Sequence, residues 1–177
     1  MALFSRLFKK NKVRAKGKWL YEQALAASRR VSLYKAGGVP DTVDGRFDLL
    51  VIHVWMLIRR LNALEAHPLG QEVFDAMFND MDNALRELGI SDTAVGKRIK
   101  DMAKVFYGRT ELYNAAQERG DAEALAVTLE RNIFSDMENK GPLGQAMAAH
   151  MQAIENAMSA QALENILENG PCYPAFA

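Results

Sequence analysis

The chain has 177 residues, of which 49% are apolar and 25% are charged. This length and composition predict a single globular domain with a substantial core, and the one cysteine excludes an intramolecular disulfide. No apolar run reaches the ~18–20 residues that a membrane-spanning helix requires, and no secretory signal follows the early basic residues.

The net charge of zero hides an asymmetry along the chain. Residues 1–35 contain ten Lys or Arg and one Glu, so the rest of the chain holds 12 basic and 21 acidic residues. A basic segment attached to an acidic body favours an anionic partner for that segment, such as lipid head groups, RNA or an acidic protein surface.

Residues 1–17 are predicted to form a basic amphipathic arm. Segments of this type lie on membrane surfaces, whereas a frayed, solvated terminus is the alternative. The candidate residues for binding an anionic membrane are the apolar ones at helical spacing and the basic ones that follow: Leu3, Phe4, Leu7, Phe8, Lys9, Lys10, Lys12 and Arg14.

Residues 18–170 are predicted to form the main helical domain, followed by a C-terminal tail at 171–177. Apolar residues recur at steps of three and four, Gly and Pro punctuate the pattern, and no stretch alternates as a strand would. The pattern predicts an all-α, single-domain bundle of about six helices without a sheet. The expected helices lie at about 18–35, 45–63, 68–88, 91–120, 121–137 and 143–169.

The helix expected at 45–63 is apolar around most of its circumference, which is typical of a helix buried on most sides. It is therefore predicted to be the central element. His53 lies within it and is expected to be a buried, hydrogen-bonded histidine.

No constellation of side chains predicts catalysis. His53, His67 and His150 are scattered without a metal-binding motif, and Cys172 has no base near it in sequence. We therefore predict no catalytic residue, no metal ligand and no cofactor.

The helix expected at 91–120 carries the candidate partner-binding residues. Spacings of three and four place its lysines on one face, which Tyr107 extends, and Arg109 could make two-pronged contacts with carboxylates. A solvated helix face is the alternative, and nothing assigns a DNA-recognition helix, so no DNA partner is predicted. The set is Lys97, Lys100, Lys104, Tyr107 and Arg109.

Nine methionines are many for this length. Met147, Met151 and Met158 recur along one side of the last expected helix. Such a stripe is either part of the core or an adaptable binding surface, and it is the second candidate for a partner-binding site.

Two blocks of sequence resemble the ubiquinol–cytochrome c chaperone family: VPDTVDGRFDLLVIHVWMLIRRL at 39–61 and LGISDTAVGKRIKDMAKVFYGR at 88–109. The likeness spans roughly residues 21–131, with further anchors at Leu33-Tyr34 and Met81-Asp82. The resemblance implies an assembly chaperone that binds cytochrome b, or another membrane protein client, during biogenesis of the ubiquinol–cytochrome c reductase, with the ribosome as a further partner.

The short chain and its immediate basic arm indicate a bacterial relative, expected in the cytoplasm and peripheral at the inner face of the cell membrane. A peripheral membrane or ribosome-associated adaptor with an unrelated client is the alternative. A small-molecule enzyme is a weaker third interpretation, because no catalytic cluster supports it.

Overall fold

The computed structural model describes residues 2–135, 137–138 and 140–176, with side chains from residue 10 onward. These residues form eight helices and no strand, which confirms the all-α single domain. The helices are α1 (Ala2–Ser28), α2 (Val31–Lys35), α3 (Val43–Ala63), α4 (His67–Glu87), α5 (Asp92–Glu118), α6 (Ala122–Ile133), α7 (Gly141–Ser159) and α8 (Leu163–Asn169).

Helix α3 is the centre of the fold and contacts α1, α4, α5, α6 and α7. Every residue from Asp48 to Leu57 is buried, so the predicted central element is confirmed. Thr42 begins the helix, because its side chain accepts a hydrogen bond from Gly45 N at 3.1 Å and satisfies a free amide of the first turn.

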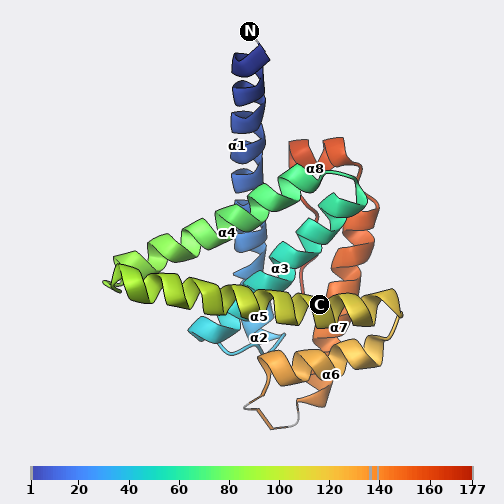
Figure 1. Cartoon of the computed structure of the whole chain (residues 1–177). Coiled ribbons are helices and arrows are strands. Elements are labelled where there is room, and N and C mark those ends of the chain that lie inside the picture. Colours follow the sequence, from blue (N-terminus) through green and yellow to red (C-terminus); the bar gives the residue numbers. More distant parts are fainter. Residues whose placement is uncertain (1, 136, 139, 177) are drawn as a thin grey trace.

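Helix α1 begins at Ala2 and runs without a break to Ser28, so the prediction of a helix starting at residue 18 was wrong. The backbone of the basic arm is the first part of this helix, and Figure 1 shows it extending beyond the other elements. Gly17 allows α1 to cross α4 closely, because a side chain there would overlap Glu72 Cβ.

The first and last predicted helices are each divided in two, which explains why eight helices replace the expected six. The chain turns at Arg30, whose extended backbone separates α1 from α2. Near the C-terminus, the last predicted helix breaks after Ser159. There Arg60 of α3 donates to the carbonyl oxygens of Ser159 and Gln161, at 3.1 and 2.5 Å. These bonds satisfy carbonyls that the end of α7 leaves free, and α8 starts shortly afterwards.

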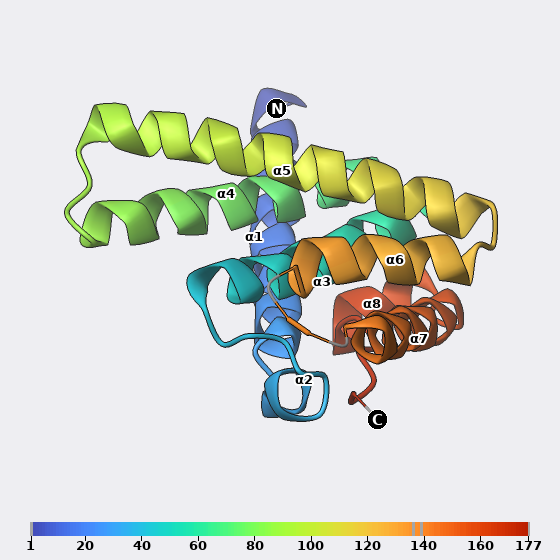
Figure 2. The same ribbon diagram turned by 90° about the horizontal axis from the view of Figure 1, so that it is seen from below.

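Helices α4 and α5 form an antiparallel hairpin that extends sideways from the rest of the molecule (Figures 1 and 2). An aromatic cluster holds the two helices together. The ring centroids of Phe74 and Phe78 on α4 lie 5.3 and 6.3 Å from that of Phe106 on α5, and Phe74 lies 5.6 Å from Tyr107.

The C-terminal tail folds back into the core, a feature that the sequence did not reveal. The ring of Tyr173 lies 5.1 Å from that of His53 on α3, and Phe176 lies 5.0 Å from His150 on α7. Arg30 donates to the carbonyl oxygens of Tyr173 and Pro174. The tail therefore connects the α1–α2 turn to the middle of the bundle.

Among the described residues, none of the helices combines the length and the apolar character needed to cross a bilayer.

Candidate functional site

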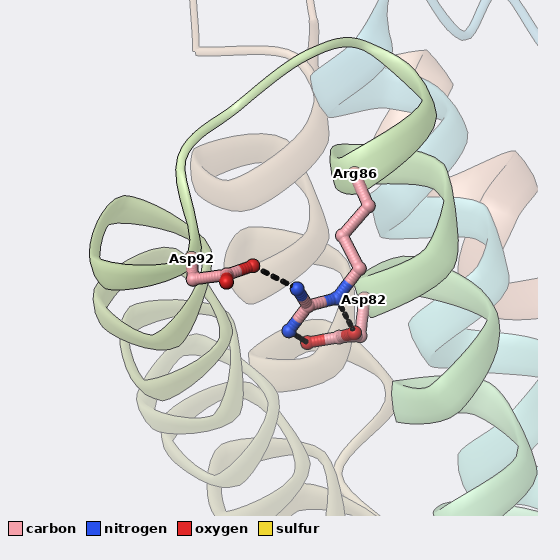
Figure 3. A network of polar contacts seen from close by, with 3 residues as sticks. All are labelled: Asp82, Arg86 and Asp92. Carbon is pink, nitrogen blue, oxygen red and sulfur yellow. Dashed lines mark hydrogen bonds and ion pairs between the residues drawn. The ribbon is translucent and has the colours of Figure 1, made fainter.

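The tip of the α4–α5 hairpin is fixed by one arginine. Arg86, in the last turn of α4, donates through Nε to Asp82 Oδ2 at 2.5 Å and also pairs with Asp92 at the start of α5 (Figure 3). The two carboxylates raise the pKa of Arg86 through these hydrogen bonds. Because the group is exposed, it contributes little stability, but it links the last turn of α4 to the start of α5.

Helix α5 presents the predicted lysines and Tyr107 on one exposed side. Lys97, Lys100 and Lys104 are exposed, and Tyr107 is 59% exposed while its ring also packs on Phe74. Lys104 forms an ion pair with Asp101 at 3.5 Å. Lys97, Lys100, Lys104 and Tyr107 are called the α5 row below.

Arg109 does not lie with the α5 row. It forms an ion pair with Asp48 on α3, and the two side chains are only 20% and 4% exposed. Nine residues correspond to two and a half helical turns, so Arg109 lies opposite Lys100 on α5. Burial lowers the pKa of Arg109, although a guanidinium stays charged in proteins. Four of the five residues therefore share one exposed side of α5 and Arg109 does not; their role in partner binding stays a prediction.

A partly apolar strip borders the α5 row, and sequence reasoning missed it. Val105 and Leu112 are 40% and 42% exposed. A side chain added at Gly108 would meet no atom of the described residues within 4 Å, apart from its own stretch of helix. The spacing of 105, 108 and 112 on one helical face was the available signal. The strip offers partly exposed apolar side chains next to positive charges.

The basic arm is anchored where it meets the body. Lys16 Nζ donates to the carbonyl oxygen of Leu167 at 2.8 Å, near the end of α8, and lies 4.1 Å from the ring centroid of Trp19. Lys10, Lys12 and Arg14 are exposed on the helix before this anchor. The side chains of Leu3, Phe4, Leu7, Phe8 and Lys9 lie outside the described residues.

A groove of about 820 Å³ runs between α1 and α4 and is lined mainly by acidic and amide side chains. Its carboxylates come from Glu22 on α1 and from Glu72, Asp75, Asp80 and Asp82 on α4. No sequence motif signalled this groove, because its two walls are about fifty residues apart in the chain.

The methionine stripe of the last long helix belongs to the core. Met147, Met151 and Met158 are at most 1% exposed on α7. The second candidate, an exposed methionine surface for a partner, was therefore wrong.

Two of the three histidines, His53 and His150, lie near each other, with ring centroids 6.2 Å apart. His53 is buried and its Nδ1 donates to the carbonyl oxygen of Leu49 at 2.7 Å, as expected for a hydrogen-bonded core histidine. Burial lowers the pKa of His53 to about 4 and also lowers the pKa of His150. In the part of the chain that the structure describes, no three His, Cys, Asp or Glu side chains gather as metal ligands would.

Comparison with known proteins identifies one family. The family model described as ubiquinol-cytochrome C chaperone matches residues 35–175. The crystal structure of the Cbp3 homolog from Brucella abortus superposes with a TM-score of 0.78 at 35% sequence identity, covering 98% of this chain and 95% of that one. No curated protein sequence matches the chain.

Proposed function

The chain belongs to the ubiquinol–cytochrome C chaperone family, and we propose that it binds cytochrome b as its client during assembly of the ubiquinol–cytochrome c reductase. Family membership supports the chaperone role, and the match extends from residue 35 to residue 175 in the C-terminal tail. The α5 row is the proposed client-docking surface.

The observation that carries this proposal is the placement of the α5 row on a helix that is braced from two sides. Arg86 ties the start of α5 to α4, and Arg109 ties its middle to the central helix. Exposed charges contribute only ~0–1 kcal/mol to stability, so three lysines on one face are better explained by binding. Their charge and the neighbouring strip of Val105 and Leu112 suit acidic loops that emerge from a membrane protein.

The basic arm is proposed to bind the anionic surface of the cell membrane at its cytoplasmic face. Each lysine or arginine near such a surface contributes about 1 kcal/mol, and apolar residues on one side of the arm would enter the head-group region. The same charge suits ribosomal RNA, so the ribosome is a further proposed partner.

Charge reversal tests the α5 row. The Lys97→Glu/Lys100→Glu variant should fold normally but fail to co-purify cytochrome b from detergent-solubilised membranes. Lys35→Glu/Arg131→Glu is the matched control, because both residues are exposed outside the row and the charge change is the same. A folded Lys97→Glu/Lys100→Glu variant that still captures cytochrome b would place the docking surface elsewhere.

Deletion of the gene tests the client itself. Membranes of the deletion strain should lose the haem b and haem c absorbance of the reductase, and the wild-type gene should restore it. Normal absorbance, together with capture of a different membrane protein, would instead support the adaptor with an unrelated client.

A further inference from the structure

We propose that the groove between α1 and α4 binds a Lys/Arg-rich juxtamembrane segment of the membrane protein client, a second contact that rests on the proposed chaperone function. This contact is distinct from the α5 row, whose positive charge would repel such a segment.

Two helices build the walls of the groove. They cross where Gly17 meets Glu72, and beyond this point α1 contributes Tyr21 and Leu25 while α4 contributes Ala76. Leu25 and Ala76 are half-buried and add apolar surface to this mainly polar lining. Two helices that diverge from a close crossing leave a channel that a third helix or an extended segment can occupy.

The charge of the groove selects its occupant. Five carboxylates line it, against two basic groups, Arg14 and Lys18, and one of the five, Asp82, is already paired with Arg86. Lys18 pairs with Glu22 at 3.7 Å, and Tyr21 Oη donates to Asp80 Oδ2 at 2.6 Å. Glu72 has no hydrogen-bond or ion-pair partner within the described residues, which leaves its carboxylate available to a cationic partner.

Asp75 is available as well, since within the described part of the chain its one polar partner is the neutral side chain of Gln71, at 2.8 Å on the same helix. Arg14, Glu72 and Asp75 also line a smaller hollow of about 390 Å³ that includes Lys10. This hollow continues the groove along α4 toward the basic arm, with two basic and two acidic groups in its lining.

Membrane proteins provide the matching chemistry. Their cytoplasmic loops carry an excess of Lys and Arg close to the ends of the spanning helices. A binding protein on that side of the membrane meets cationic juxtamembrane segments first, and a groove in which carboxylates outnumber basic groups complements them in charge.

The position of the groove on α1 agrees with this occupant. The arm and the groove wall belong to one continuous helix, and ten residues of helix span about 15 Å. An arm bound at the head groups as far as residue 8 would hold residues 11–25 of the groove wall within about 5–25 Å of that residue, where juxtamembrane segments emerge.

The test uses the full chain and a synthetic probe. The probe is a fluorescein-labelled 16-residue helical peptide of Ala and Leu with four Lys on one face, and the same peptide with Glu in place of Lys is its control. Anisotropy titrations should show binding of the Lys peptide, weaker binding at high salt, and no binding of the Glu peptide. The Glu72→Lys/Asp75→Lys variant should bind the Lys peptide about tenfold more weakly.

A matched variant controls for the general change in charge. Glu111→Lys/Glu118→Lys changes the net charge equally at exposed positions outside the groove, and it should bind the Lys peptide within about twofold of the wild type. Equal weakening in both variants, or no weakening in Glu72→Lys/Asp75→Lys, would overturn the groove as the binding site. Light scattering under the same conditions should give the mass of one chain. If the wild type is instead a dimer and the Glu72→Lys/Asp75→Lys variant is a monomer, the groove binds a second copy of the chain and the proposal is overturned.

Client capture separates this inference from the proposed function. A wild-type chain that captures no cytochrome b overturns the proposed client, while the peptide titrations still decide whether the groove binds cationic segments. A second outcome is that the groove variant captures as much cytochrome b as the wild type and binds the Lys peptide with unchanged affinity. That result overturns the groove as a binding site and leaves the proposed function intact.

Discussion

Arg109, in the middle of α5, forms an ion pair with Asp48 in the most enclosed part of α3. Asp48 is one of few charged side chains in the core, and its carboxylate needs a cation because an isolated buried charge is costly. The pair therefore determines how the hairpin helix that carries the α5 row sits on the central helix.

Removal of Arg109 should destabilise the fold more than removal of any lysine of the row. Arg109→Ala leaves the carboxylate of Asp48 buried without its partner, which should lower the free energy of unfolding by about 3 kcal/mol. Lys100→Ala should change it by less than about 0.5 kcal/mol. Urea unfolding followed by circular dichroism measures both.

The double variant Asp48→Leu/Arg109→Met provides the control for this interpretation. Apolar residues of similar volume often replace a buried pair without loss, so the double variant should be more stable than Arg109→Ala alone. The loss of unfolding free energy in the double variant is compared with the sum of the losses in Asp48→Leu and Arg109→Met. If the two values are equal, the two residues act independently.

The C-terminal tail should behave as part of the core. Tyr173 is buried, and its hydroxyl donates to the carbonyl oxygen of His53 at 2.8 Å. Tyr173→Ala should cost about 3–5 kcal/mol, as for other buried aromatic residues, whereas Tyr173→Phe, which loses only the hydroxyl, should cost about 1 kcal/mol. Thermal unfolding compares them, and an unchanged melting temperature for Tyr173→Ala would show that the tail does not dock in solution.

Stability should fall as the pH drops below the ordinary pKa of histidine. The pKa of His53 is lowered to about 4 by burial, against about 6.5 in an unfolded chain. Between pH 6.5 and pH 4 the unfolded state therefore binds a proton that the folded state does not. Stability is fully present above pH 6.5 and decreases toward pH 4, by about 3 kcal/mol for this group.

The variant His53→Leu isolates that contribution. It removes the titrating group but keeps an apolar side chain in the core, so its unfolding free energy should depend less on pH between 6.5 and 4 than that of the wild type. Equal slopes for the two proteins would assign the acid sensitivity to other groups.

Deletion of residues 1–14 should remove membrane binding without unfolding the body. Residues 10–15 are largely exposed, while the anchoring contacts of Lys16 and Gly17 remain. Flotation with vesicles that contain anionic lipid should recover the full chain and lose the truncated one. Equal flotation with neutral vesicles would contradict the electrostatic part of the proposal, since basic residues are attracted by anionic head groups.

The sequence alone determined those features that arise from neighbouring residues. Apolar periodicity identified the helices and the all-α class, and the all-round apolar pattern of residues 47–61 identified the central helix. Spacing along one helix also placed Lys97, Lys100, Lys104 and Tyr107 together. These predictions succeeded because helix geometry relates residues three or four positions apart, whatever lies elsewhere in the chain.

Only the tertiary structure decided the features that depend on distant residues. The orientation of Arg109 depends on Asp48, sixty-one positions earlier. The break between α1 and α2 lies at Arg30, whose side chain bonds to Tyr173 and Pro174, more than 140 positions later. The acidic groove forms where α1 and α4 cross at a glycine, and the α7 methionines enter the core because α3 and α6 cover them. Contacts of this kind leave no local periodicity, since any of several faces of a helix can meet a partner and the packing of the whole chain selects one.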